Sequence, residues 1–277
     1  MILGMGPKPF FGKGGAMPKT FINGIDIYYN LYGSGPPFVL VHSLGMDQTM
    51  WDLQTPPLSQ DFQVIVYDLR GQGQSESPDF SYSLDLFADD LHHLLRHLGL
   101  KNARILGLSL GGRIALKFAL KYPQETRALI LADTQSEAPE ENRTQFLWTA
   151  DLARKEGMEK AAESFFSGPL FQGLAKIHPE RFQKEKARFT QTSAIGFAQC
   201  CIAIVRMERL TAFLTGVQAP TLALAGEKDE PYLPFLTLYA KSIPRCKSMI
   251  VPQAGHLSNL ENPEAFNDAV SKFLKGV

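Results

Sequence analysis

The most constraining feature of this 277-residue chain is the alternation of short, largely apolar runs with segments of helical periodicity. Such runs, rich in aliphatic and β-branched residues, are typical of strands buried on both faces of a parallel sheet. They lie at 38–41, 64–67, 103–106, 128–131, 221–224 and 248–251. Helical patterns follow Ser83, cover 110–121 and follow Pro263. The alternation predicts an α/β fold, with a mostly parallel central sheet and helices on both of its faces.

Three segments depart from this rhythm. Residues 1–19 are rich in glycine and proline, lack periodicity and are predicted to form a flexible N-terminal tail. Alternating residues around Asn23-Gly24 predict a β-hairpin. Residues 134–215 carry helical patterns, at 146–152 and 195–214, and no run that suggests a strand. We therefore predict an α/β core of 20–133 and 216–277, with 134–215 inserted between two strands as a helical cap that roofs a site.

The composition excludes several classes of protein. Lys and Arg number 28, as do Asp and Glu, so the formal net charge of +0 offers no electrostatic footprint for nucleic acid. The longest hydrophobic run, from Cys200 to Val205, is far shorter than the about 20 residues of a membrane-spanning helix. The three cysteines include an adjacent pair and match neither a disulfide framework nor a zinc motif. We expect a cytoplasmic protein without metal, nucleic-acid partner or membrane contact.

The segment Gly107-Leu108-Ser109-Leu110-Gly111 is the candidate nucleophile motif. It follows a predicted strand and opens a predicted helix, which is the setting that a G-x-S-x-G nucleophile elbow requires. Glycines allow the sharp turn that holds the serine in a strained conformation, and the helix N-terminus directs N–H groups at a developing oxyanion. We predict that Ser109 is a catalytic nucleophile.

A serine hydroxyl needs a base, and His256 is the best of six histidines. It follows the last predicted strand, at the edge of the sheet where such sites are built, and it satisfies the chain order Ser…Asp/Glu…His. The others are His42 in the loop after strand 38–41, His92, His93 and His97 on the polar face of a helix, and His178 in the cap. A metal site of Asp89, His93 and His97 fits the i, i+4 spacing, but a solvated helix face is the simpler interpretation.

The third member of the predicted triad should orient the imidazole and stabilise its charged form. Asp229 follows the strand 221–224 and precedes His256 by 27 residues, so both position and order favour it. Asp133, after the preceding strand, is its rival, and Glu227, Glu230 and Glu261 are weaker candidates.

The oxyanion hole needs two backbone N–H donors, which we assign to Leu110 and to Leu44 in the loop after strand 38–41. His42 and Ser43 are expected to hold this loop in shape, and Ser43, Trp148 and Leu257 to line the substrate pocket. The arginines of the cap include Arg143, Arg154, Arg206 and Arg209.

Together these motifs resemble the α/β-hydrolase superfamily, and above all its small carboxylesterases and 3-oxoadipate enol-lactone hydrolases. The resemblance covers about residues 20 to 275 and is weakest in the cap. It is carried by the elbow, by Tyr67-Asp68-Leu69-Arg70-Gly71-Gln72-Gly73-Gln74-Ser75, and by Ala254-Gly255-His256-Leu257-Ser258-Asn259-Leu260-Glu261. Many relatives have His-Gly where this chain has His42-Ser43, although the enol-lactone hydrolases share Ser-Leu-Gly there. The resemblance implies the α/β-hydrolase fold and a Ser-His-Asp triad, and it leaves ester and lactone open.

The leading hypothesis is a carboxylesterase that cleaves small-molecule esters of short to medium acyl chain and needs no cofactor. The alternatives are an enol-lactone hydrolase and a ligand-binding signalling protein that retains the triad. Ser109 argues against the superfamily members with an aspartate nucleophile, and no cysteine stands at an elbow. A nicotinamide-dependent oxidoreductase is opposed because the segment 71–75 lacks the last glycine of G-x-G-x-x-G.

Overall fold

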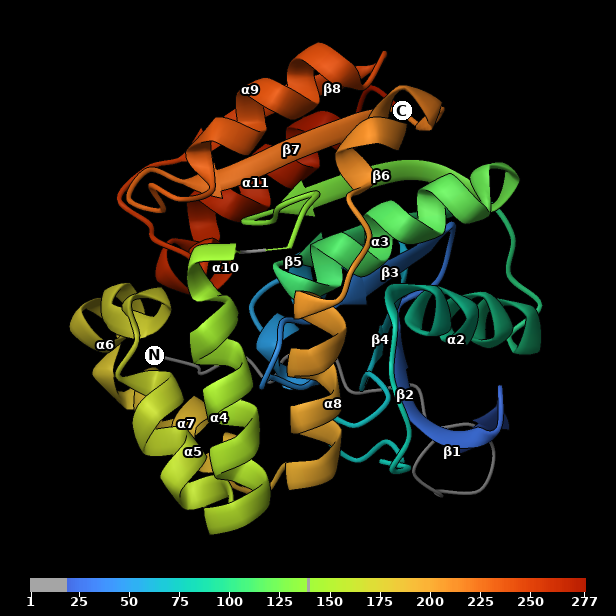
Figure 1. The fold of residues 1–277 in the computed structure, drawn as a ribbon. Coiled ribbons are helices and arrows are strands. Elements are labelled where there is room, and N and C mark those ends of the chain that lie inside the picture. The colour runs from blue at the N-terminus through green and yellow to red at the C-terminus, as the bar shows by residue number, and fades with distance from the viewer. Residues whose placement is uncertain (1–18, 139) are drawn as a thin grey trace, which may run out of the picture.

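The computed structural model describes residues 19–138 and 140–277 and has the predicted α/β architecture (Figure 1). Eight strands form one sheet in the order β1-β2-β4-β3-β5-β6-β7-β8. Their bounds are β1 (Lys19–Ile22), β2 (Ile25–Tyr32), β3 (Pro37–Val41), β4 (Gln63–Tyr67), β5 (Ala103–Leu108), β6 (Thr126–Ala132), β7 (Thr221–Gly226) and β8 (Cys246–Val251). Strands β3 to β8 pair in parallel, as predicted, and β1 and β2 are antiparallel to their neighbours.

The N-terminal end of the sheet confirms one prediction and shortens another. Asn23 and Gly24, with φ values of 47° and 80°, form the turn of the predicted hairpin, where Ile22 pairs with Ile25. Two positive φ values are typical of the tight turns that join antiparallel strands. The predicted tail lies outside the described residues except for Lys19, which is the first residue of β1.

Strand β8 differs from the prediction that every apolar run is buried on both faces. It is the last strand of the sheet, and its residues Lys247, Ser248, Met249 and Ile250 are exposed. The central strands behave as predicted, since every residue of β7 is buried. The run 248–251 is largely apolar, like those of the central strands, but it follows Lys247, and charged residues of this kind are typical of sheet edges.

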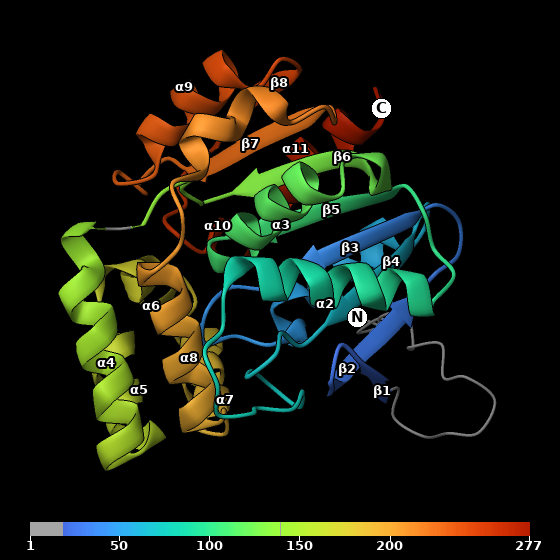
Figure 2. The same cartoon turned by 45° about the vertical axis from the view of Figure 1, so that its right-hand side comes forward.

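Helices cover both faces of the sheet (Figures 1 and 2). Helix α2 (Leu84–His97) begins at Ser83, whose hydroxyl accepts a hydrogen bond from Leu86 N–H at 3.2 Å. It packs beside α3 (Leu110–Lys121), which ends before Pro123 as predicted. Outside the segment between β6 and β7, the other helices are α1 (Thr55–Leu58), α9 (Leu233–Ser242), α10 (Ser258–Glu261) and α11 (Pro263–Leu274), with the 3₁₀ helices η1 (Gln48–Trp51) and η2 (Pro123–Glu125).

The chain between β6 and β7 is helical, and no strand occurs in its described residues. Its helices are η3 (Glu140–Asn142), α4 (Arg143–Glu156), α5 (Met158–Phe166), η4 (Pro169–Phe171), α6 (Gln172–Ile177), α7 (Pro179–Phe189), α8 (Ala194–Val205) and η5 (Leu210–Gly216). Helices α4 to α8 stand together beyond the carboxyl ends of the strands (Figures 1 and 2). We call these five helices the cap. The predicted helix 195–214 is wrong in extent, because α8 ends at Val205 and η5 is a separate element.

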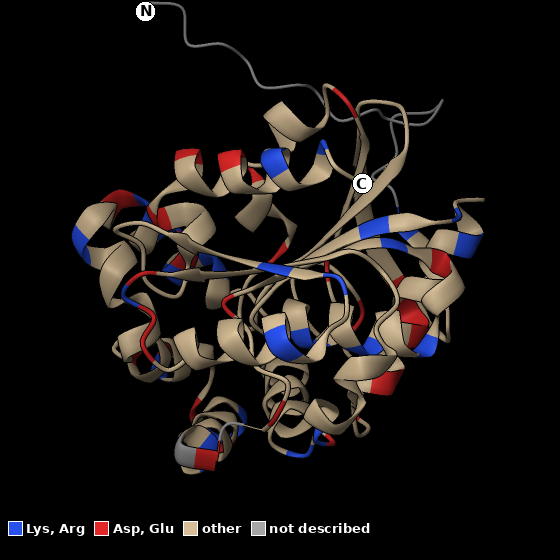
Figure 3. Ribbon diagram, turned by 90° about the horizontal axis from the view of Figure 1, so that it is seen from above, with Lys and Arg blue, Asp and Glu red and all other residues tan. Residues whose placement is uncertain are grey.

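The surface carries charges of both signs, with basic and acidic positions intermingled over the ribbon (Figure 3). This distribution agrees with the balanced composition. None of the helices within 19–138 and 140–277 has the length and hydropathy of a membrane span.

Candidate active site

The carboxyl ends of adjacent strands bring the predicted site residues to one edge of the sheet. In the register of β3 and β5, Val41 pairs with Gly107, so the loop after Val41 lies beside the turn that carries Ser109. Strand β3 lies between β4 and β5 in the sheet. The chain runs from β3 to β4 on one side and then crosses to β5 on the other side, so the carboxyl end of β3 is a topological switch point. Ligands of open α/β sheets bind at such a point.

Ser109 occupies a strained turn between β5 and α3. Its φ of 55° and ψ of −113° lie outside the backbone regions that residues other than glycine prefer. Strained backbone of this kind clusters at functional sites. The turn requires both glycines of the motif, because a Cβ on Gly107 would collide with the Gly111 carbonyl, and one on Gly111 with the Val41 carbonyl. Ser109 N–H donates to the Ala132 carbonyl at 2.9 Å, which fixes the turn to β6.

Ser109, His256 and Asp229 form one hydrogen-bonded row. The Ser109 hydroxyl lies 3.0 Å from His256 Nε2, and His256 Nδ1 lies 2.9 Å from Asp229 Oδ2. All three residues are buried, with 4–6% of their surface exposed. The carboxylate therefore fixes the imidazole so that Nε2 can take a proton from the serine hydroxyl.

Asp133, the rival acid, has other partners. Its carboxylate accepts hydrogen bonds from Gly226 N–H at 2.8 Å and from the Ser258 hydroxyl, and the side chain is fully buried. Burial, reinforced by the negative charge of Asp229, raises the pKa of Asp133 well above its usual range. Asp133 thus ties the loop of Asp229 to the loop of His256, while the contact with the imidazole belongs to Asp229.

The loop after β3 is held in a shape that leaves one N–H unused. His42 Nε2 accepts from Leu69 N–H at 2.9 Å and its Nδ1 lies 2.8 Å from the Ser43 carbonyl. Burial lowers the pKa of His42 to about 4, so the neutral ring that this pair of bonds requires is favoured. Gly45 N–H donates to the Gln72 side chain at 2.9 Å. Leu44 N–H has no partner within 19–138 and 140–277, as an oxyanion donor requires.

The cap covers this loop with aromatic rings. A Cβ on Gly45, whose φ is +70°, would lie 2.7 Å from Phe189 and 2.9 Å from Phe165, so both rings pack directly on the loop. Phe165, Phe189 and Phe197 have ring centroids 4.8–5.4 Å apart. Phe189 and Phe197 are fully buried, whereas Phe165 is partly exposed.

The three predicted pocket residues behave differently. Ser43 and Leu257 are buried beside Leu44 and His256, their neighbours in sequence. Trp148 on α4 is 51% exposed and does not belong to the buried cluster around Ser109. Its helix turns Ala150 and Ala153 inward, and Trp148 lies on the opposite side of that helix.

Two contacts of the site were not predicted. The Thr134 hydroxyl donates to the Ser109 carbonyl at 2.7 Å, and the Tyr232 ring lies 4.4 Å from the His256 ring. Both residues lie shortly after the end of a strand, but their types carry no distinctive signal. Neither could have been singled out without knowledge of the packing.

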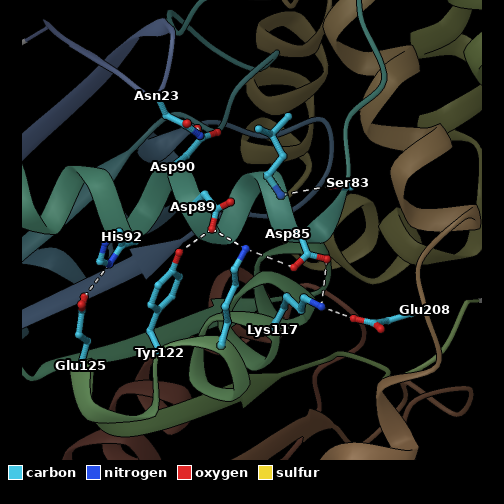
Figure 4. Close-up of polar contacts among 12 residues, drawn as sticks. Asn23, Ser83, Asp85, Asp89, Asp90, His92, Lys117, Tyr122, Glu125 and Glu208 are labelled. Atoms are coloured by element: carbon cyan, nitrogen blue, oxygen red, sulfur yellow. Dashed lines mark hydrogen bonds and ion pairs between the residues drawn. The ribbon is translucent and has the colours of Figure 1, made fainter.

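The prediction of a solvated helix face holds for His93 and His97, which are exposed, whereas His92 is half-buried and the face also carries polar contacts to neighbouring elements. Tyr122 donates to Asp89 at 2.6 Å and His92 lies 3.0 Å from Glu125 (Figure 4). His97 contacts the Thr20 hydroxyl at 3.1 Å. Throughout the residues that the structure describes, no group of three or more His, Cys, Asp or Glu side chains is arranged to hold a metal ion.

Comparison with known proteins matches residues 36–263 to the alpha/beta hydrolase fold family. Among curated proteins, the chain is 30% identical over 258 residues to 3-oxoadipate enol-lactonase 2 of Acinetobacter baylyi, covering 91% of this chain and 94% of that one. Among solved structures, a thermophilic esterase from Thermogutta terrifontis has a TM-score of 0.84 at 31% identity, with 93% and 96% of the two chains covered.

A second structure supports the same grouping. The enol-lactonase from Burkholderia xenovorans LB400 has a TM-score of 0.86 at 29% identity, with 93% of this chain and 100% of that one covered. The family match spans most of the chain, and esterases and enol-lactonases are both among the similar proteins. The strand order, the serine turn and these similarities lead to one conclusion: this chain belongs to the α/β-hydrolase family.

Proposed function

We propose that this α/β hydrolase is a serine esterase that cleaves carboxylic esters of short to medium acyl chain through an acyl-enzyme. The observation that carries the proposal is the row from Ser109 through His256 to Asp229, with contacts of 3.0 Å and 2.9 Å. Nucleophile, base and orienting acid stand in hydrogen-bond order, and the nucleophile sits at a helix N-terminus.

The proposed reaction has two similar halves. Ser109 Oγ attacks the ester carbonyl while His256 Nε2 takes its proton, and the oxyanion that forms accepts hydrogen bonds from Leu44 and Leu110 N–H. The oxyanion collapses, the bond to the alcohol oxygen breaks, and His256 returns the proton to the alcohol. Water then gives a proton to His256 and attacks the acyl-enzyme. The bond from the acyl carbon to Ser109 Oγ breaks, His256 returns the proton to Ser109, and the carboxylic acid leaves. Asp229 stabilises the imidazolium in both halves.

The cap supports a neutral, apolar acyl group. Phe165 is the partly exposed ring of the cluster on the loop of Leu44, and we place the acyl chain against it. A free carboxylate beneath the cap would need an available cation. Arg143, Arg154, Arg206 and Arg209 are exposed, and the half-buried Arg181 and Arg188 of α7 both pair with Glu185. Arg154 pairs with Asp79 at 2.7 Å, Arg209 pairs with Glu137 at 3.2 Å, and Arg143 donates to the Val205 carbonyl.

A lactonase of the 3-oxoadipate enol-lactone type is the second candidate. It is favoured by the 30% identity to the Acinetobacter baylyi enol-lactonase over nearly the whole chain. The same two half-reactions open a lactone, because the leaving alcohol then stays attached to the acyl group. The difference lies in the substrate's free carboxylate, which would require a cation such as Arg206 to turn inward.

A substrate panel distinguishes the two candidates. With p-nitrophenyl esters, we expect kcat/KM to rise roughly fourfold per methylene that fits, to peak between acetate and hexanoate, and to fall steeply by dodecanoate. 3-Oxoadipate enol-lactone should be a poor substrate. Slow turnover of every ester with fast turnover of the lactone, abolished in Arg206→Ala or another cap-arginine variant, would establish the lactonase instead. Equal rates at every chain length would contradict an enclosed acyl site.

A further inference from the structure

Glu261 lies at the end of α10 and binds the backbone on both sides of His256. Its carboxylate accepts a hydrogen bond from Gly255 N–H at 2.7 Å and one from Leu257 N–H at 3.3 Å. These are the residues immediately before and after His256. The proposed reaction requires His256 Nε2 to remain within hydrogen-bond distance of Ser109, and no step of it uses Glu261.

The Glu261 carboxylate is buried and faces His256 and other titratable groups of the candidate active site. Glu261 is 5% exposed, and burial raises its pKa, although the two N–H bonds and the proximity of His256 oppose that rise. The titratable groups that face it are His256 and Asp229, Asp133 behind them, and His178 from the cap, whose Nε2 lies 3.4 Å from the Glu261 carbonyl. A charge here therefore acts on the imidazolium as well as on the loop.

The cap touches the same carboxylate. Helix α6 contacts α10 (Figures 1 and 2), and a Cβ on Gly173 of α6 would collide with the carboxyl group of Glu261. Any other residue at 173 would force the carboxyl group or the helix to move. The carboxylate is thus enclosed between the loop of His256 and the backbone of a cap helix.

We propose that Glu261 is a positioning residue that holds the His256 loop in register with Ser109, and that cap helix α6 keeps its carboxylate in place through Gly173. The proposal rests on the role of His256 in the proposed function. It joins the cap to the chemistry, because a cap that moves away from α10 releases the carboxylate that the loop depends on.

The first test compares Glu261→Gln with Glu227→Gln. Glu227 is a control for the position of the bond, since its carboxylate also accepts a backbone N–H of the loop that carries His256, from Gln253 at 2.9 Å, but it is exposed and binds three residues before His256 rather than on both sides of it. We expect Glu261→Gln to lower kcat about 10-fold with KM within about twofold, and to move the acid limb of the pH–rate profile to lower pH, because the imidazolium loses a nearby anion. Glu227→Gln should leave both unchanged.

The second test needs no substrate, so it separates this proposal from the proposed function. An NMR titration follows the His256 ring, identified by its loss in His256→Ala. The midpoint should move to lower pH in Glu261→Gln and stay in place in Glu227→Gln. An unchanged kcat and an unchanged midpoint in Glu261→Gln overturn the proposal. If the wild type hydrolyses no ester or lactone, the proposed function fails while the titration still decides the role of Glu261.

The third test acts from the cap side. Alanine at Gly173 places a methyl group where the carboxyl group lies, and a carboxyl group at the end of a flexible side chain can move aside without unfolding the protein. Gly173→Ala should lower kcat about threefold to tenfold, with circular dichroism as the control for folding, because a displaced carboxylate leaves Gly255 and Leu257 N–H without their acceptor. Gly216→Ala is the control, because its nearest neighbour would lie at an ordinary 3.6 Å. Full activity in Gly173→Ala overturns the role of the cap.

Discussion

The edge of the sheet that carries the candidate site is held by directed hydrogen bonds, whereas the cap that covers it is held by apolar packing. At the sheet edge, Ser109, Asp133 and His256 are each fixed by directed hydrogen bonds at 2.7–3.0 Å, and Ser109 and Asp133 have positive φ values. The cap meets this edge with Phe165, Phe189 and other stacked rings. Directed bonds hold a geometry within tenths of an ångström, whereas apolar packing tolerates changes of shape.

This contrast assigns different roles to the two regions. Changes at the sheet edge should lower kcat because they disturb atoms that react or hold reacting atoms in place. Changes in the cap rings should alter which acyl chain is preferred and leave the chemical step almost intact. The predictions below follow this division, from the largest expected effect to the smallest.

The largest effect is expected for the nucleophile. Ser109→Ala should lower kcat by a factor on the order of 10⁶, because members of a triad act as a unit. Steady-state kinetics on the best ester, with circular dichroism as the control for folding, measures this. Activity within tenfold of the wild type would remove Ser109 from the mechanism.

The two buried aspartates give the next largest effect and a direct comparison. Asp229→Asn should lower kcat by about 10⁴, because an amide favours the wrong tautomer of His256. Asp133→Asn should lower it far less, since Asp133 bonds Gly226 and Ser258 rather than the imidazole. If the larger loss occurs in Asp133→Asn, the acid of this enzyme stands after β6.

His42, which holds the loop after β3 in shape, should make the free energy of unfolding depend on pH. His42 has a pKa of about 4 in the folded protein, below its ordinary 6.5, so the unfolded chain takes up the proton first as the pH falls. The stability it contributes is present above pH 6.5 and is lost toward pH 4, by about 2 kcal/mol between pH 7 and pH 5. Urea unfolding of the wild type and His42→Gln at both values measures it, and the same change in both proteins would contradict the assignment.

The smallest effect concerns the cap. Phe165→Leu should enlarge the acyl site and shift the preferred chain by about one methylene, a roughly fourfold change in the ratio of kcat/KM between longer and shorter esters. Hydrolysis of acetate should remain within about threefold. A general loss of kcat with no shift in preference would mean that the cap rings support the oxyanion loop rather than the acyl chain.

The sequence predicts the sheet edge far better than the cap for a physical reason. Ser109, Asp229 and His256 each lie within a few residues of a strand end, and the register of a parallel sheet brings those ends together. In the cap, periodicity indicates helices but not their partners. It therefore missed the break after Val205, the exposure of Trp148 and the contact of Phe189 with Gly45, all of which depend on packing between distant segments.

The most direct test of the central claim is covalent labelling of the native protein with a fluorophosphonate, read by intact mass and peptide mapping. We predict one added phosphonyl group, located on Ser109, absent in Ser109→Ala and formed much more slowly in His256→Ala. Labelling should be slowed by a short-chain ester that competes for the site. A label on another residue, or an unlabelled protein that continues to hydrolyse esters, would contradict the account.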